Sequence, residues 1–458
     1  RDVSKRDFFV LTDHTTNDYV ANGITDKEWE AIKRDVIAYH EPGKFETILG
    51  YEISFAAPSG HQNVYMFADN NTYLAMPLFR RHTTAGVPQL WSLLRSSLPA
   101  GTKVFTAPHH TGVLWNGVSG PVTQLGPGYR DSLLRPAFEV FSSHGSSEKY
   151  PPEPGMSYAD FDGPSRASAL GPHYARNALD LHHHVGFFAS SDDHTGRPGM
   201  RTRGIAAMHA PRLSRNDLYD AVMRRSVYGT TGERILLRFR EESIPMGAKG
   251  NLKAGALPRF HVSVHGTDEI DHVELVRWDF FDGVRSADNQ PIFRSINHYH
   301  ISGMDTTYEY TDSSFTGPAV YYLRVKQKNV ILDNSLELPG YHHPWAWSSP
   351  IWVGMPQGLG LNEDNYTPPA RQLTLLQNYP NPFSVATEIP FQAASGGRVA
   401  IGVYNMVGQR VAYLTGEIHA PGYYTFPFQP DGLAAGNYLY KLETGTSVTQ
   451  VYRMTYVK

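Results

Sequence analysis

The chain has 458 residues, a formal net charge of -3 and no cysteine. This length predicts two or three domains. The charge argues against nucleic acid as a partner, and no apolar run is long enough to cross a bilayer. Without cysteine the chain has no disulfides or thiolate ligands, so a bound metal must accept imidazole and carboxylate, as Zn, Mn and Fe do.

Residues 1–236 alternate short apolar runs with helical patterns. FFVL, TILG, VFTA, FEVF and GFFA are typical of buried strands, and the segment after Thr25 shows helical periodicity behind a capping box with Glu28. Apolar strands separated by helices predict βα units and a parallel sheet covered on both faces. The chain opens with RDVSKRDFF, with neither a signal peptide nor an initiator Met, so we expect it to start partway into this domain.

The pattern changes along the rest of the chain. Residues 237–355 alternate polar and apolar positions between turn residues, which predicts an antiparallel β-sandwich. Residues 356–372 are rich in Gly, Pro and Asn and are typical of a linker. Residues 373–458 return to short strands and predict a small, separate all-β domain.

Five predicted strands of residues 1–236 end in His, Asp or Glu, and 13 of the 21 histidines fall in this region. One such residue after a strand is typical of a turn or a helix cap. In a parallel sheet or barrel, however, the strand ends meet at one edge, so five of them predict a shared metal site. The residues are His14 with Asp13, Glu52, His109 with His110, His144, and Asp192 with Asp193 and His194.

Other candidates are less sharply defined. His61 begins an apolar run shortly after Glu52, and His82 lies in a loop before a helix; a ligand role stays open for both. Arg197, followed by Arg201 and Arg203, is suited to clamp an anionic substrate, or else lies in a solvated loop. The HHH run at 182–184 precedes its strand, so we expect it on the surface at the opposite end of the sheet. No G-x-S-x-G elbow and no phosphate-binding GK[ST] loop occurs in the sequence.

Several motifs in residues 8–199 resemble the PHP (polymerase and histidinol phosphatase) domain, in a secreted branch known as a domain of unknown function. They are LTDHTTND, GYEIS, GHQNVYMF, TAPHHTG, EVFSSHGSSE and ASSDDHTGRPG. The resemblance implies a distorted (β/α)7 barrel, two or three divalent ions at the carboxyl ends of its strands, and phosphoester hydrolysis. By motif it implies the metal ligands His14, Glu52, His109, Asp192 and His194, a further ligand at His61 or His82, and supporting roles for His110 and His144.

The sequence departs from the PHP pattern at its start. The family opens with an H-x-H motif on its first strand, and this sequence has none. We therefore expect the first strand to be missing because the chain starts just after it. One metal position would then lack two ligands, which could leave the chain as given inactive.

The last 85 or so residues resemble the C-terminal sorting domain of the type IX secretion system. The resemblance is carried by LLQNYPNPF, VAIGVYNMVGQRVAYL and NYLYKLETG. It implies export by the type IX machinery, followed by release or attachment at the cell surface.

These observations predict a secreted, metal-dependent hydrolase acting on small-molecule or polymer-borne anionic esters, foremost phosphoesters. The ions would activate a water, Arg197 would neutralise phosphoryl charge, and His110 or His144 would protonate the leaving group. One alternative is hydrolysis of another ester or an amide bond. The other is a surface-displayed binding protein with a degenerate catalytic domain.

Overall fold

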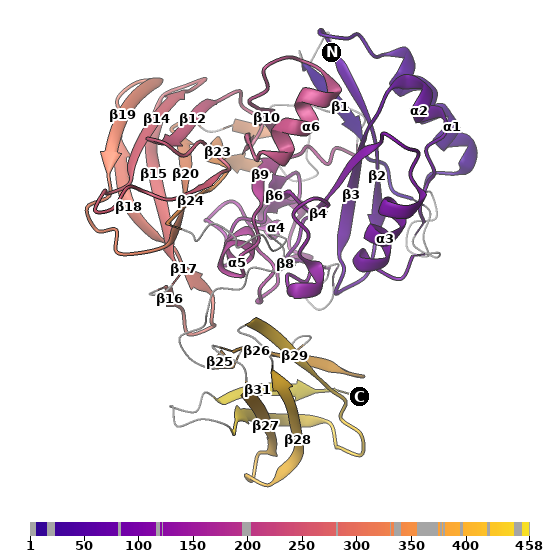
Figure 1. The fold of residues 1–458 in the computed structure, drawn as a ribbon, viewed down its shortest axis with the longest axis vertical. Coiled ribbons are helices and arrows are strands. Elements are labelled where there is room, and N and C mark those ends of the chain that lie inside the picture. Colours follow the sequence, from indigo (N-terminus) through magenta and orange to yellow (C-terminus); the bar gives the residue numbers. More distant parts are fainter. Residues whose placement is uncertain are drawn as a thin grey trace. The chain divides into compact units, whose positions relative to one another are not determined.

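The computed structural model describes most of the residues of the chain. They are 6–15, 23–80, 84–115, 120, 122–194, 203–280, 283–329, 331–333, 340–354, 374–375, 378, 381–393, 397–418, 422–443 and 451–457. The chain divides into two compact units, residues 1–357 and 358–458, which Figure 1 colours along the sequence. Three predicted residues, His82, Arg197 and Arg201, lie outside the described part.

The first unit opens with a four-stranded sheet in the order β1–β2–β3–β4. β1 (Phe8–Leu11) pairs in parallel with β2 (Glu46–Ser54), but β3 (His61–Phe67) and β4 (Lys103–His109) run antiparallel to their neighbours. Only six residues connect β2 to β3, too few for the crossover that parallel strands need. The expected all-parallel sheet is therefore wrong here, and the described strands form separate sheets rather than a closed (β/α)7 barrel.

Three helices accompany this sheet. α1 (Asp26–Ala38) begins at the predicted capping box, in which the Thr25 backbone N donates to Glu28 Oε2 at 2.8 Å. α3 (Val87–Ser97) buries Leu90, Trp91 and Leu94, and α2 (Asn70–Leu74) is a short turn between β3 and α3. The apolar faces of the helices share one core with β2 and β3.

A second group of strands surrounds a parallel pair. β6 and β9 pair in parallel, β7 pairs with β6, and β5 and β8 form a separate antiparallel ladder. The elements are β5 (Val113–Trp115), a 3-10 turn (Pro127–Tyr129), β6 (Ala137–Ser142), β7 (Gly145–Ser146), α4 (Tyr158–Asp162), β8 (Arg166–Ser168), α5 (Ala175–Asp180) and β9 (Gly186–Ala189). In β6 and β9 the predicted parallel arrangement is present.

The rest of the first unit is built from an eight-stranded and a three-stranded sheet that share one apolar core. The larger sheet contains β10 (Ile205–Met208), β11 (Val227–Thr230), β13 (Lys249–Gly250), β15 (Ile270–Asp279), β18 (Arg294–His300), β20 (Ala319–Gln327), β23 (Trp345–Ser348) and β24 (Ile351–Val353). The smaller contains β12 (Leu236–Glu241), β14 (Arg259–His265) and β19 (Asp305–Thr311). Minor elements are α6 (Arg215–Met223), β16 (Val284–Arg285), β17 (Pro291–Ile292), β21 (Ile331–Asp333) and β22 (Gly340–His342).

The two regions expected to be separate domains are joined through this larger sheet. β11, from the region ending at residue 236, pairs with β23 from the region beginning at 237, placing Gly229 opposite Trp347. Both regions belong to the first compact unit. The chain does not divide into separate compact units at 236/237, so a boundary between two domains there stays a prediction.

The second unit consists of two sheets around a core of its own. One contains β25 (Thr374–Leu375), β26 (Thr387–Ala393) and β29 (Gly422–Phe428); the other contains β27 (Gly397–Asn405), β28 (Arg410–Ile418), β30 (Gly436–Leu442) and β31 (Val451–Tyr456). Across the described part of both units, no helix is long and apolar enough to span a membrane.

Candidate metal centre

The four-stranded sheet brings several predicted ligands to one edge. β1 leads to His14, which bridges to Glu52 in β2, and His109 ends β4. His61 is paired with His109 across β3 and β4. Because β3 is antiparallel, its start lies at the edge where β2 and β4 end. His61 therefore reaches the site although it begins an apolar run.

The parallel pair β6 and β9 supplies the remaining candidates. His144 follows β6, and Asp192 and His194 follow β9. Parallel neighbours end at the same edge, so these residues emerge together. His144 Nε2 lies 2.6 Å from Asp192 Oδ2, so the side chains that follow the two strands are in direct contact.

His14, Glu52 and His61 form the first group of the centre. Glu52 Oε1 lies 2.7 Å from His61 Nδ1 and 3.4 Å from His14 Nδ1. Glu52 Oε1 and His61 Nδ1 are buried, and beyond these contacts neither makes a hydrogen bond. Burial acts to raise the pKa of Glu52, but the charges of His14 and His61 outweigh it and lower that pKa to about 2. Two buried ligand atoms that meet at this distance and have no other hydrogen-bond partner fit a shared cation.

Asp192 is the centre of the second group. Its Oδ2 accepts hydrogen bonds from His109 Nε2 at 2.7 Å and from His144 Nε2. Burial opposes ionisation, but the positive charges of His109 and His144 hold the pKa of Asp192 well below its usual range. His194 Nδ1 lies 3.8 Å from Asp192 Oδ1 on a largely exposed side chain. Asp192 has a φ of +45°, an uncommon backbone state that recurs at functional sites.

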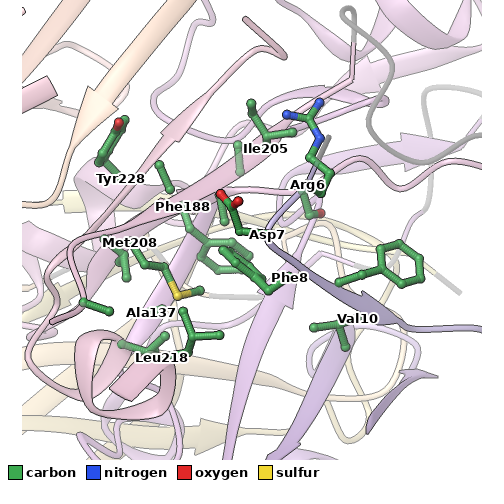
Figure 2. A pocket seen from close by; sticks show the side chains of 18 of the residues that line it. Arg6, Asp7, Phe8, Val10, Ala137, Phe188, Ile205, Met208, Leu218 and Tyr228 are labelled. Carbon is green, nitrogen blue, oxygen red and sulfur yellow. The ribbon is translucent and has the colours of Figure 1, made fainter. Parts of the chain in front are cut away.

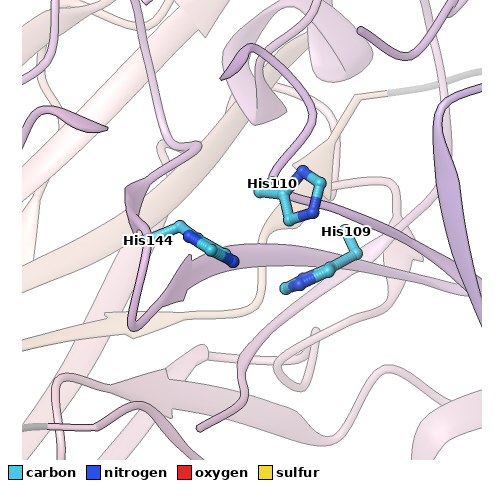
Figure 3. Close-up of side chains that lie close together, drawn as sticks. All are labelled: His109, His110 and His144. Atoms are coloured by element: carbon cyan, nitrogen blue, oxygen red, sulfur yellow. The ribbon is translucent and has the colours of Figure 1, made fainter. Parts of the chain in front are cut away.

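His110 lies between the two groups. Its ring centre is 4.0 Å from that of His109, 4.6 Å from His61 and 4.9 Å from His144, and Figure 3 shows the rings of His109, His110 and His144 around one space. Its buried Nδ1 has no hydrogen-bond partner. Burial, and then the charge of His109, lower the pKa of His110 well below its usual value. A neutral imidazole with an unused nitrogen is the form that binds a metal.

The candidate ligand atoms form four overlapping sets of three, each with its atoms within 4.8 Å of one another. The set of Glu52, His109 and Asp192 joins the two groups. Imidazole and carboxylate donors in this arrangement fit Zn, Mn or Fe. The other sets are His14–Glu52–His61, His109–His110–His144 and His144–Asp192–His194. The eight residues of these sets were all predicted from the sequence, and the structure brings them together. Their roles in binding metal or in catalysis remain a proposal.

Supporting side chains that the sequence did not reveal hold these residues. Glu139, buried in β6, accepts from His109 Nδ1 at 2.6 Å and from Ser190 Oγ. Asp162, at the end of α4, contacts His144 Nδ1. A carboxylate on the far nitrogen of an imidazole fixes the ring and its tautomer. The charge of Glu139 inside the apolar run FEVF was a usable signal, whereas Asp162 carried none.

Two other expectations fare differently. Arg203 is buried, with its Nη2 3.9 Å from Asp193 Oδ1 instead of open to a substrate. The HHH run was expected on the surface, and this is wrong for His183. That ring is buried, and its Nε2 contacts the Leu125 carbonyl at 2.7 Å. The His183 ring can be buried because this hydrogen bond replaces the one that its Nε2 would make with water.

A separate cavity of about 820 Å³ lies between β1, β9, β10 and α6. Its wall is largely apolar, and Figure 2 shows Phe8, Phe188, Met208 and Leu218 around it. Of the candidate residues that the structure describes, only Asp192 lines it. The histidines therefore face a different space.

Comparison with known proteins places the chain in two classes. Residues 377–454 match the model of a secretion system C-terminal sorting domain. The protein is thus exported by type IX secretion, to the medium or the cell surface. Residues 4–203 and 189–246 match the model described as protein of unknown function (DUF3604), together more than half of the chain. The chain belongs to the DUF3604 family.

Relatives with similar sequences occur in chlamydiae. An uncharacterized protein of Chlamydia trachomatis serovar D is 29% identical over 258 residues, covering 50% of this chain and 36% of the relative. One from Chlamydia pneumoniae is 32% identical over 170 residues, covering 33% and 23%. The chain thus spans about a third or less of the length of these relatives.

One solved structure shows a distant similarity to this chain. It is a Bacteroides vulgatus protein described as a two-domain protein containing a predicted PHP-like metal-dependent phosphoesterase. It shares 13% identity, with a TM-score of 0.27 over 74% of this chain and 86% of that one. A likeness at this level carries no argument about function.

Proposed function

We propose that this secreted protein is a metal-dependent hydrolase of phosphoesters. The observation that supports it most is the convergence of Glu52, His109 and Asp192 from three strands, with ligand atoms within 4.8 Å of one another. Buried nitrogen and oxygen atoms at this place, on Glu52, His61 and His110, have no hydrogen-bond partner. Native proteins seldom leave such atoms unpaired without a ligand to bind.

His14, Glu52, His61, His109, Asp192 and His194 would hold two or three divalent ions. Such ions, when bound, lower the pKa of a water molecule toward neutrality and offset the charge that develops on phosphoryl oxygens. Glu139 and Ser54 orient His109 and His14, with Ser54 Oγ 2.7 Å from His14 Nδ1. The contact with Glu139 leaves the other nitrogen of His109, Nε2, directed at Asp192.

His144 is assigned to leaving-group protonation. Asp162 contacts its Nδ1, so the ring orientation is fixed, and its Nε2 faces the centre at Asp192. His110 lies at the same place and is the other candidate for this role. The anion-binding role predicted for Arg197 stays a prediction, because that residue lies outside the described part.

The test is the Asp192→Ala variant, measured for bound metal by elemental analysis and for turnover of phosphate mono-, di- and triesters. We expect both to be lost. His265→Ala is the matched control, because His265 is an exposed histidine of β14. Normal metal content and turnover in Asp192→Ala would refute the assignment.

The substrate panel also separates the other possibilities. Turnover of carboxyl or sulfate esters but not phosphate esters would identify a different hydrolase. A folded wild-type protein that binds no metal would favour the alternative of a binding protein with a degenerate catalytic domain.

A further inference from the structure

A two-stranded ladder lies beside the histidines of the metal centre. β5 and β8 pair antiparallel, with Trp115 directly opposite Arg166. The Trp115 ring meets His110 and His144 at centre distances of 5.8 and 6.2 Å, both edge to face. The ladder therefore adjoins the part of the centre assigned to the leaving group.

Arg166 lies on the Trp115 ring. Its guanidinium carbon is 4.2 Å from the ring centre, a distance typical of cation–π contact. Cross-strand pairing fixes both backbones, so the indole holds the guanidinium in one place without using its N–H donors. An arginine held this way keeps its planar fork available for an anion.

The polar contacts of Arg166 leave donors available. Its Nε lies 3.7 Å from Asp162 Oδ2, well beyond the ~2.8 Å of a charge-assisted hydrogen bond. Nη1 makes one long contact of 3.4 Å to Ser165 Oγ. Nε is buried and has no hydrogen-bond partner. The side chain as a whole is 31% exposed, so a ligand can reach it.

The carboxylate that Arg166 approaches also serves the centre. Asp162 contacts His144 Nδ1 as well as lying near Arg166. Asp162, at the end of the short helix α4, thus lies beside both the histidine and the guanidinium. This places a fixed positive charge next to the imidazole that faces Asp192.

We propose that Arg166, held by Trp115, binds an anionic phosphoryl oxygen of the substrate. The inference rests on the proposed function and narrows it to esters that carry negative charge, meaning phosphate mono- and diesters in preference to neutral triesters. A bidentate guanidinium–phosphate contact supplies both charge and orientation.

Inorganic phosphate is the probe, titrated into the metal-loaded protein by calorimetry. Arg166→Ala should weaken phosphate binding by about 10- to 100-fold, as expected for loss of a hydrogen bond to a charged group. Arg166→Lys keeps the charge but not the fork, so it should recover only part of the affinity. Arg212→Ala is the control, because Arg212 is an exposed arginine paired with Asp217. Unchanged affinity in Arg166→Ala, or no phosphate binding by the wild type, overturns the inference.

Kinetics then separate a binding role from a structural one. For a phosphomonoester, Arg166→Ala should raise KM and lower kcat/KM, and millimolar guanidinium should restore part of the loss. Trp115→Phe keeps an aromatic ring under Arg166 and should retain phosphate binding, whereas Trp115→Ala removes the ring and should not. Turnover that is lost irreversibly, equally for charged and neutral esters, would show a merely structural residue.

The two proposals fail in different ways. If the wild type binds metal and hydrolyses phosphoesters while Arg166→Ala behaves identically, only this inference falls. If the wild type hydrolyses no phosphoester, the proposed function falls whatever the phosphate titration shows.

Discussion

The candidate metal centre and the Glu148 cluster are both buried and charged, but their polar atoms are paired differently. Glu148 accepts from Tyr322 OH at 2.6 Å, Trp347 Nε1 at 2.8 Å, and from Arg176 and Arg324. Arg324 also reaches Glu274 and Glu153, at 2.6 Å each. Every buried polar atom of Glu148, Arg176 and Arg324 has a partner.

The metal centre lacks this completeness. Glu52 Oε1 and His61 Nδ1 are equally buried and contact only other candidate ligands of the centre, without a hydrogen bond, and the buried His110 Nδ1 makes no hydrogen bond. Complete pairing identifies the Glu148 cluster as a structural link, since it joins residues of the predicted first region to strands β20 and β23. Incomplete pairing within a cluster of converging imidazole and carboxylate groups is what a metal site without its ion would show. Mutation, pH and added metal should therefore affect the two clusters differently.

Glu148→Ala should cost the most stability. Removing the carboxylate leaves Arg176 and Arg324 buried without their main partner, and breaking such a pair costs about 3 to 5 kcal/mol. Denaturant unfolding measures the loss, and elemental analysis of the folded fraction should show unchanged metal. Glu153→Ala, which removes a more exposed partner of the same Arg324, should cost less. Loss of metal in Glu148→Ala would show that the two clusters are not independent.

The pH dependence of stability should also identify the Glu148 cluster. Burial alone would raise the pKa of Glu148, but Arg324 and Arg176 lower it to about 2. The carboxyl has a pKa of about 4.3 when unfolded. Its contribution is therefore complete above about pH 5 and is lost as the pH falls toward 2, roughly 3 kcal/mol in all.

Comparing the wild type with Glu148→Gln isolates the contribution of the Glu148 charge to the free energy of unfolding. The difference in unfolding free energy should be constant from pH 7 to 5 and shrink below that. A difference that stays constant down to pH 3 would contradict the lowered pKa.

The sequence indicated which side chains converge, whereas it did not indicate the direction of the strands that carry them. His14, Glu52, His109, His144 and Asp192 each end an apolar run, a local signal that needs no knowledge of pairing. Strand direction has no such signal, because an apolar run looks the same in either direction. The prediction therefore missed that β3 runs antiparallel, and with it the reason why His61 joins the site.

Supporting partners were missed for a related reason. Glu139 is 30 residues from the His109 that it orients, and Asp162 is 18 from His144. Such contacts depend on tertiary packing. In contrast, β14 was predictable, since its buried and exposed positions alternate as the sequence RFHVSVH does.

Metal should stabilise the protein through the unpaired atoms of the centre. At a free concentration 100 times its Kd, Zn²⁺ or Mn²⁺ should raise the free energy of unfolding by about 2.7 kcal/mol. Thermal unfolding with and without a chelator measures the shift. Glu52→Gln should abolish most of it, whereas Glu153→Ala should keep it. An equal shift in Glu52→Gln would place the bound metal elsewhere.

Glu139→Gln should have the smallest effect, because Glu139 orients a candidate ligand without itself belonging to the convergent sets. The His109 ring would lose its charged partner at 2.6 Å, and loss of such support typically lowers metal affinity about 10- to 100-fold. Turnover should recover at high metal concentration, which separates orientation from chemistry. Glu46→Gln is the matched control, because Glu46 is a buried carboxylate 2.7 Å from His40 Nε2, away from the centre. Equal metal affinities in the two variants would show that Glu139, like Glu148, only completes the packing.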